Sequence, residues 1–336
     1  MKISIKPYRL PLKHTFTIAH GSRTHQDAAV VTLEKNGQYG IGEATAVSYY
    51  GLSIEEMIGT FQSKIAALEA IPFENPKQFW EVCQPIISKV PFLQCALDVA
   101  AYDCYAKLSQ KPLYELWGLN INQLPLSNYT IGIDSVDTMV TKMQEVPWPV
   151  YKIKLGTQND LEIVKALRQH TDAKFRVDAN TGWTAKQTLE LAPQLKELGV
   201  EFIEQPLKVT DWEGMKLLKA ESPIPIIADE SCQLLTDVEK CAEHFHGINI
   251  KIMKCGGLTP ALEMIKLARE RNIEIMVGCM AESSVGISGI AHLLPLIDYA
   301  DMDGAMLLGE DIASGVHFKA GIAQFPDRFG TGAVLV

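Results

Sequence analysis

Two lysines, Lys152 and Lys154, stand one residue apart inside an otherwise apolar run of the sequence, residues 151–156. If this run is a β-strand, both lysines project from one face, because side chains alternate between the two faces of a strand. At roughly 6 Å and an effective dielectric constant of about 20, two ammonium groups repel by about 2.8 kcal/mol, equivalent to about two pKa units. The pair therefore predicts a lysine with a lowered pKa, which can act as a base near neutral pH.

Three later apolar runs each end in a carboxylate, Asp178, Glu204 and Asp229. They are separated by 26 and 25 residues, about one strand–helix unit, so they are expected on neighbouring strands at one rim of a sheet. Three carboxylates at one rim repel one another unless a divalent cation lies between them, and all-oxygen ligation suits Mg²⁺. The spacing predicts a magnesium site formed by these three residues.

Lys251 follows Asp229 by 22 residues and ends a further apolar run. Counting strands places Lys154 on the second and Lys251 on the sixth, and these positions are opposite each other on a ring of eight. A substrate bound between them would have an ammonium group on each face of one carbon atom. Lys254 is three residues further along, so we expect it to face the other side of the strand in a structural role.

The elements that position these residues alternate regularly from residue 126 onward, with short apolar runs between amphipathic segments. The runs predict strands at 126–133, 150–156, 174–180, 200–205, 225–230, 248–254, 274–280 and 300–306. Helices are predicted at 160–169, 185–198 and 260–271. Eight strands with intervening helices indicate a (β/α) barrel, and a doubly wound open sheet is the alternative. The sequence lacks the Gly-x-Gly-x-x-Gly motif that would favour the open sheet.

The N-terminal part reads as a mixed α and β segment. Strands are predicted at 2–10, 28–34 and 40–44, with a turn at 35–37. Ser53 followed by Glu56 predicts a helix start, and apolar residues at helical spacing predict a packed helix over 93–108. We expect a first domain over residues 1–117, completed by a C-terminal tail over 311–336, and a barrel over 118–310.

Composition limits the classes of partner and the compartment. The 336 residues are 47% hydrophobic and 21% charged with a net charge of −9, which argues against nucleic acid and anionic membranes as partners. No apolar run is long enough to span a bilayer, and the seven cysteines lack a Cys-x-x-Cys pair. The sequence predicts a cytoplasmic protein with reduced thiols that binds small molecules or cations, and a homo-oligomer is compatible with it.

These motifs together resemble the muconate-lactonising subgroup of the enolase superfamily. The resemblance rests on the Lys-x-Lys, Asp, Glu, Asp, Lys series, on residues 96–98 through Lys107 with Pro112-Leu113, and on Gly40-Ile41-Gly42-Glu43. It covers nearly the whole chain. It implies an α/β fold, a modified TIM barrel of the (β/α)₇β type with an α+β capping domain, and one Mg²⁺ on Asp178, Glu204 and Asp229.

The same resemblance implies roles for the lysines. Lys154 and Lys251 would be the two acid/base residues, while Lys152 would tune Lys154 and contact the substrate carboxylate. Removing a proton next to a carboxylate creates a dianionic ene-diolate, which requires a metal ion and lysines to neutralise the developing charge. Lysines on both faces permit deprotonation on one side and reprotonation on the other, and this inverts a stereocentre.

Asp301 and Asp303 lie at the end of the eighth predicted strand, where two carboxylates on one face would bind a cation. An Asp-x-Asp at this place is similar to that of the dipeptide epimerases, where it binds the α-ammonium group of the substrate. Thr130, near the end of the first strand, is a further candidate donor to the substrate. The resemblance thus implies a dipeptide epimerase that inverts the α-carbon of the C-terminal residue by 1,1-proton transfer.

Alternatives remain open at this stage. Epimerases acting on Ala-Glu tend to present an arginine in the loop after the first strand, where this chain has Gly21, with Arg23 two residues beyond. We therefore favour an apolar second residue. The same scaffold supports o-succinylbenzoate synthase or N-acylamino acid racemase activity, and a non-catalytic binding protein is the alternative of another class. Whether Glu230 and Glu282 belong to the site is not decided by sequence.

Overall fold

The N-terminal part of the chain forms a three-stranded antiparallel sheet. The computed structural model describes residues 1–18, 21–87 and 89–336. The strands are β1 (Lys2–Ile18), β2 (Gly21–Lys35) and β3 (Gln38–Thr45), in the order β1-β2-β3. Asn36 and Gly37 have φ angles of 50° and 76°, as in a tight hairpin turn, so the predicted turn is confirmed. The strands β1 and β2 are longer than predicted because they pair along one long hairpin.

Among the described residues, four helices follow this sheet, and the first and third of them pack against it. They are α1 (Ile54–Glu69), α2 (Pro76–Ile87), α3 (Pro91–Leu108) and α4 (Leu113–Leu116). Ser53 and Glu56 form a reciprocal capping box at the start of α1, as predicted. Gly40 and Gly42 lie directly against α3, where a Cβ atom would collide with backbone carbonyl oxygens of the helix. The Gly-x-Gly spacing therefore permits the close approach of α3 to β3.

The second part of the chain is a nearly closed parallel barrel of eight strands in sequential order. The strands are β4 (Tyr129–Ile131), β5 (Val150–Lys154), β6 (Lys174–Asp178), β7 (Val200–Glu204), β8 (Ile226–Ala228), β9 (Gly247–Lys251), β10 (Glu274–Gly278) and β11 (Tyr299–Asp301). A parallel bridge between Ser127 and Ala300 joins the first and last strands.

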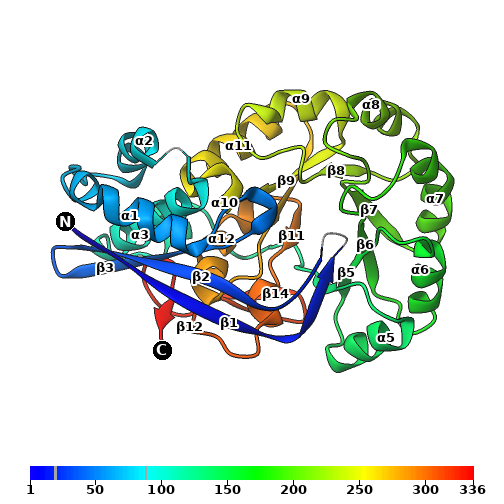
Figure 1. Ribbon diagram of the computed structural model, residues 1–336, viewed down its shortest axis with the longest axis horizontal. Helices are drawn as coiled ribbons and strands as arrows, with labels where there is room; N and C mark the ends of the chain where they lie inside the picture. Colours follow the sequence, from blue (N-terminus) through cyan, green and yellow to red (C-terminus); the bar gives the residue numbers. More distant parts are fainter. Residues whose placement is uncertain (19–20, 88) are drawn as a thin grey trace.

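Helices follow the first seven barrel strands and cover the outside of the barrel (Figure 1). They are α5 (Val136–Glu145), α6 (Asp160–Arg168), α7 (Ala185–Glu197), α8 (Trp212–Glu221), α9 (Asp237–His244), α10 (Ile252–Cys255) with α11 (Leu258–Glu270), and α12 (Ser284–Ala291). The fold is therefore a (β/α)₇β barrel with an α+β capping domain, as the resemblance implied. The barrel strands are shorter than predicted, because the chain turns into loops once each apolar run ends.

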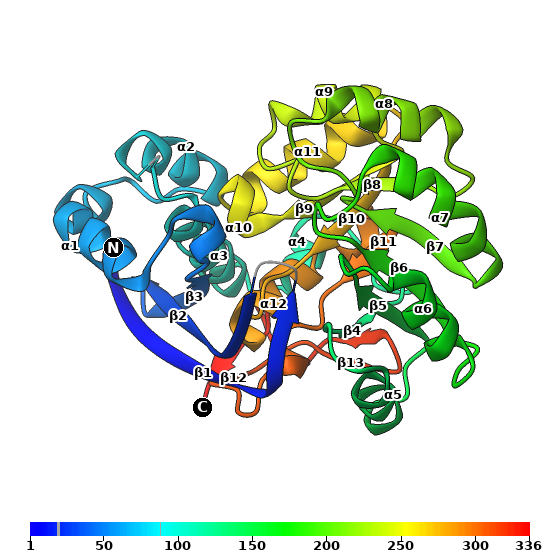
Figure 2. The same ribbon diagram turned by 45° about the vertical axis from the view of Figure 1, so that its right-hand side comes forward.

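The capping sheet and helices lie to one side of the barrel (Figure 2). The chain ends in four short strands, β12 (Ala313–Ser314), β13 (His317–Lys319), β14 (Ile322–Gln324) and β15 (Val334–Leu335). This tail contacts the N-terminal part, since the carboxylate of Asp103 on α3 accepts hydrogen bonds from the backbone and side chain of Thr331. Among the described residues, no helix is both long and apolar enough to cross a membrane.

Candidate active site

The charged residues predicted from spacing lie at one end of the barrel. The parallel register aligns Lys154 with Asp178, and Asp178 with Glu204, on neighbouring strands. On the other side of the ring, Gly278 of β10 is aligned with Lys251 and with Asp301. The C-terminal strand ends thus place five charged side chains at one level, which is the catalytic end of barrel enzymes.

The two lysines of β5 share this site but differ in their contacts. The Nζ atom of Lys152 lies 2.7 Å from Asp301 Oδ2, 2.7 Å from Glu204 Oε2 and 3.2 Å from Asp178 Oδ2. An ammonium group has three N–H donors, so these contacts occupy all of them. Lys154 donates one hydrogen bond of 2.6 Å to Asp178 Oδ2. Lys152 is thus fixed, while Lys154 keeps donors free for a substrate.

Lysine repulsion does not lower the pKa of Lys152. Burial opposes the charged form of this lysine, but Asp301, Glu204 and Asp178 outweigh it and raise its pKa well above the usual value. Burial also opposes the charge on Lys251, yet Asp229 raises the pKa of that lysine as well. Direct contacts with carboxylates outweigh repulsion between two lysines at about 6 Å.

The three predicted metal ligands lie together inside the barrel end. One oxygen each of Asp178, Glu204 and Asp229 lies within 4.8 Å of the others, and all three residues are buried. Burial opposes the ionisation of Asp178 and Asp229, but neighbouring lysines outweigh it and lower both pKa values. Burial, followed by the charge of Asp178, instead raises the pKa of Glu204 to about 8. A buried set of carboxylate oxygens is the donor set that Mg²⁺ prefers.

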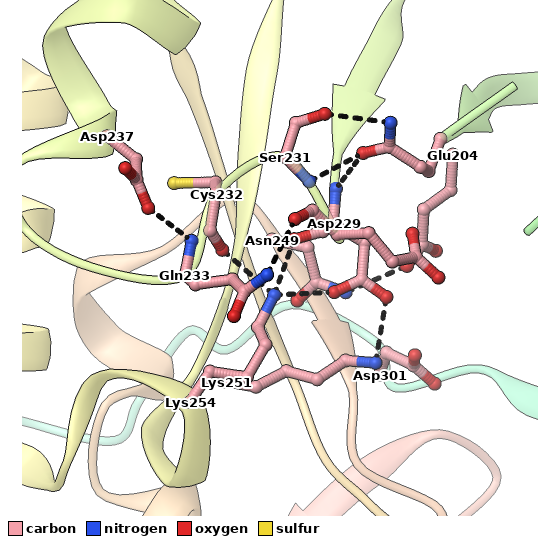
Figure 3. Close-up of polar contacts among 12 residues, drawn as sticks. Glu204, Asp229, Ser231, Cys232, Gln233, Asp237, Asn249, Lys251, Lys254 and Asp301 are labelled. Carbon is pink, nitrogen blue, oxygen red and sulfur yellow. Dashed lines mark hydrogen bonds and ion pairs between the residues drawn. The ribbon is translucent and has the colours of Figure 1, made fainter. Parts of the chain in front are cut away.

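Lys251 and Lys254 both point at Asp229 (Figure 3). Lys251 Nζ lies 2.9 Å from Asp229 Oδ2. Lys254 Nζ donates to Asp229 Oδ1 at 2.7 Å, to the Asp229 carbonyl at 2.6 Å and to the Cys232 carbonyl at 2.9 Å. The predicted outward orientation of Lys254 is therefore wrong. The strand ends at Lys251 and α10 begins at Ile252, so a residue three positions on returns to the same side.

Asp301 and Asp303 lie beside the lysines of β5, and their pKa values are shifted in opposite directions. Asp301 contacts Lys152 through Oδ2 and accepts a 2.7 Å hydrogen bond from Asn128 Nδ2 on Oδ1. Burial disfavours the charge on Asp301, yet Lys152 outweighs it and lowers the pKa to about 2. Burial and the neighbouring Asp301 raise the pKa of Asp303 to about 7. Thr130 contacts this pair through its backbone N–H, which donates to Asp303 Oδ2.

Two asparagines were missed by sequence analysis although they contact predicted residues. Asn128 donates to Asp301, and Asn249 Nδ2 donates to Glu204 Oε1 at 2.9 Å. Asn128 lies two positions before Thr130, and Asn249 lies two before Lys251, so each shares the inward face with a residue that was identified. Extending the period of two backward along each predicted strand would have found both.

A cavity with a volume of about 120 Å³ opens above these charges. Lys152, Lys154, Lys251, Asp301 and Asp303 line it. Its remaining walls come from both parts of the chain and are formed by Phe16, Arg23, Val47, Tyr49, Tyr50, Thr130, Asn180, Asp229, Glu230, Cys279, Met280, Ala281 and Leu307. A molecule bound in this cavity would therefore contact the capping domain and the barrel together.

Arg23 and the two undecided glutamates differ in their positions relative to this cavity. Arg23 reaches the cavity wall beside Phe16, and burial lowers its pKa. Glu230 also lines the cavity and accepts a 3.3 Å hydrogen bond from Asn180 Nδ2, while burial raises its pKa to about 7. Glu282 is buried, does not line the cavity and accepts a hydrogen bond from the Met280 N–H.

Comparisons with known proteins agree with this geometry. Residues 2–118 match the N-terminal domain of mandelate racemase and muconate lactonizing enzymes, and residues 135–336 match the enolase C-terminal domain-like family. The chain is 54% identical over 336 residues to an L-Ala-D/L-amino acid epimerase of Maribacter sp., covering 100% of this chain and 99% of that protein.

Two solved structures have the same fold. A dipeptide epimerase from Cytophaga hutchinsonii, complexed with Mg and D-Ala-L-Val, has a TM-score of 0.94 at 25% identity and covers 99% of this chain and 95% of its own. A dipeptide epimerase from Enterococcus faecalis, complexed with Mg and L-Leu-L-Tyr, has a TM-score of 0.91 at 32% identity and covers 99% and 98%.

Proposed function

The chain belongs to the mandelate racemase and muconate lactonizing enzyme family, and on this premise we propose that it is a Mg²⁺-dependent dipeptide epimerase. The reaction inverts the α-carbon of the C-terminal residue of a dipeptide. The observation that carries the proposal is the arrangement of Lys154 and Lys251 on β5 and β9, which are four places apart in the eight-stranded order and thus across the ring. The carboxylate triad and the Asp301–Asp303 pair lie between them.

Each charged residue of the site has a separate proposed role in the reaction. One of Lys154 and Lys251, as the neutral amine, removes the α-proton from one face, and the other, as the ammonium ion, delivers a proton to the opposite face. Each makes one contact to a carboxylate oxygen, which leaves the rest of its nitrogen facing the substrate. Lys152 stays protonated and places positive charge beside the substrate carboxylate. Asp178, Glu204 and Asp229 would hold Mg²⁺, which when bound supplies positive charge against the ene-diolate as it forms.

Asp301 and Asp303 are proposed to bind the free α-ammonium group of the dipeptide. This separates the epimerase from o-succinylbenzoate synthase and from N-acylamino acid racemase, because the substrates of both lack that group. It also disfavours a non-catalytic binding protein, since all three carboxylates and both acid/base lysines are present in one site.

Asp301→Asn tests the proposal directly. The change removes a charge facing the ammonium group, so kcat/KM on dipeptides should fall by about 10- to 150-fold, as for loss of a hydrogen bond to a charged group. Epimerisation is followed by mass spectrometry of α-deuterium uptake in D₂O over a dipeptide panel. Unchanged kcat/KM in this variant would exclude the epimerase assignment, and an unreactive panel with turnover of N-acylamino acids would favour the racemase.

The second residue of the substrate is proposed to be apolar. Phe16, Val47, Met280 and Leu307 supply apolar surface to the cavity walls, and the two related complexes hold dipeptides ending in Val or Tyr. Besides the three lysines of the site, Arg23 is the cation of the described cavity wall that would suit an acidic side chain. Its guanidinium group donates to Gln26 Oε1 and lies 5.7 Å from the centre of the Phe16 ring, so it already has partners.

The raised pKa of Asp303 predicts how dipeptide binding depends on pH. Below about 7 this carboxyl is protonated and must lose its proton before it can pair with an ammonium group. We expect kcat/KM to rise about tenfold per pH unit up to about 7, and to fall again above about 8 as the substrate amine loses its proton. Asp303→Asn should remove the lower limb at a reduced plateau. A lower limb at the same pH in this variant would assign it to another group.

We further propose the expected domain division and compartment. Residues 1–117 with the tail 311–336 are assigned to the capping domain, and residues 118–310 to the barrel. The hydrogen bond from the Leu113 N–H to the Gly330 carbonyl and those from Thr331 to Asp103 support joining the tail to the first domain. A cytoplasmic location is supported by the seven cysteines, each of which is a free thiol.

A further inference from the structure

Two buried asparagines each donate an amide N–H to a carboxylate of the site. Asn128 Nδ2 lies 2.7 Å from Asp301 Oδ1, and Asn249 Nδ2 lies 2.9 Å from Glu204 Oε1. Both asparagines have no exposed surface, and neither lines the cavity. They therefore act on a bound molecule only through the carboxylates that they contact.

The orientation of the Asn128 amide is determined by Arg176. Arg176 Nη1 donates to Asn128 Oδ1 at 3.2 Å and to the carbonyl of Ala300 at 2.8 Å. A guanidinium group can only donate, so the oxygen of the amide must face Arg176 and the NH₂ group must face Asp301. The second contact also fixes the backbone next to Asp301. Arg176 itself is buried and is paired with Glu201 at 3.0 Å.

Asp301 needs such support because a buried carboxylate readily takes up a proton. In the described parts of the chain, the carboxylate of its neighbour Asp303 accepts hydrogen bonds only from Thr130, and its pKa is raised to about 7. Asp301 has a different donor on each oxygen, Lys152 on Oδ2 and Asn128 on Oδ1. Each oxygen keeps a second lone pair for an ammonium group.

We propose that Asn128 is a positioning residue for the amino end of the substrate, holding Asp301 in the orientation that receives the α-ammonium group. This inference rests on the proposed function of the site. Two hydrogen bonds link Arg176 to Asn128 and Asn128 to Asp301, so the buried arginine holds the carboxylate that faces the substrate. Its contribution is to substrate binding, because the acid/base lysines do not contact Asn128.

Asn249 provides a matched control within the same barrel. It is equally buried and donates the same amide group to a carboxylate, but that carboxylate is a proposed metal ligand. Gly278 leaves room for it, since a Cβ atom at that position would lie 2.7 Å from Asn249 Oδ1. Replacement of either asparagine by alanine removes one amide of the same size, so the two variants differ mainly in which carboxylate loses its partner.

The experiment compares Asn128→Ala, Asn128→Asp and Asn249→Ala with the wild-type protein. The variant Asn128→Asp keeps the size of the side chain and an oxygen for Arg176, so it remains informative if Asn128→Ala does not fold. We measure KM and kcat on the best substrate of an L-Ala-L-X dipeptide panel, the affinity of the metal-free protein for Mg²⁺ by titration calorimetry, and the melting temperature of each variant.

Both Asn128 variants should raise KM by about 10- to 100-fold with kcat within about threefold, and should leave Mg²⁺ affinity unchanged. Asn249→Ala should weaken Mg²⁺ binding by about tenfold or more. Unchanged KM in both Asn128 variants, or a loss of Mg²⁺ affinity equal to that of Asn249→Ala, would overturn the inference. A wild-type protein that epimerises none of the panel would instead refute the proposed function on which the inference rests.

Discussion

Lys154→Ala is expected to abolish epimerisation, with a fall in kcat of at least about 10³-fold, because a general acid/base group is lost and no other lysine of the site has free donors on that face. Lys152 cannot take over, since three carboxylates occupy its ammonium group. Lys251→Ala is expected to have the same effect on epimerisation from the opposite side of the ring.

The two lysine variants are distinguished by proton exchange in D₂O. Each retains one base, so each should still exchange the α-proton of one epimer without forming the other, and the two variants should exchange opposite epimers. Lys165→Ala, which changes an exposed lysine on α6 paired only with Glu162, is the control and should have full activity. Full epimerisation in both Lys154→Ala and Lys251→Ala would contradict the two-base mechanism.

Removal of the divalent cation is expected to abolish turnover without unfolding the protein. Lys152, Lys154 and Lys251 already contact the carboxylate triad, so the metal-free site retains partners for its buried charges. Without the cation, however, the ene-diolate lacks a charge worth several kcal/mol, and the rate should fall by more than about 10³-fold. Saturating Mg²⁺ at about 100 times its dissociation constant should stabilise the fold by about 2.7 kcal/mol.

The measurement is activity after dialysis against a chelator, with residual metal determined by atomic emission, followed by restoration with Mg²⁺. The melting temperature is recorded in both states. Glu204→Gln serves as the protein-side counterpart, because it removes one ligand charge and should lower both Mg²⁺ affinity and activity. Undiminished turnover by protein shown to be free of metal would refute the assignment of Asp178, Glu204 and Asp229 as a catalytic metal site.

The barrel and the positions of its charged residues could be predicted because their signals are local and repeated. A carboxylate at the end of each of several apolar runs, at intervals of one strand–helix unit, identifies a rim without knowledge of any contact. The predicted strands for Asp178 and Glu204 were correct in place and too long by one or two residues. The last residue of a strand is set by where backbone pairing stops, and the local residue types indicate that position only weakly.

The orientation of Lys254 and the charge state of Lys152 depend on contacts between distant parts of the chain. Lys254 was predicted on the wrong side because the predicted strand ran three residues too far, and a change from strand to helix reverses which side a residue three positions on will face. The pKa of Lys152 is set mainly by burial and by Asp301, which is 149 residues away in sequence. No local sequence pattern indicates that these two residues are in contact.

The bridge between Ser127 and Ala300 has a consequence for how the enzyme is made. The proposed ammonium subsite lies across this seam, with Asn128 and Asp301 separated by 173 residues. Contacts between the first and last strands have the largest loop-closure cost in the barrel and are expected to form late in folding. The acid/base lysines Lys154 and Lys251 and the carboxylate triad all precede residue 252, whereas Asp301 belongs to the last barrel strand. The subsite for the substrate amine is therefore the last part of the site to be synthesised.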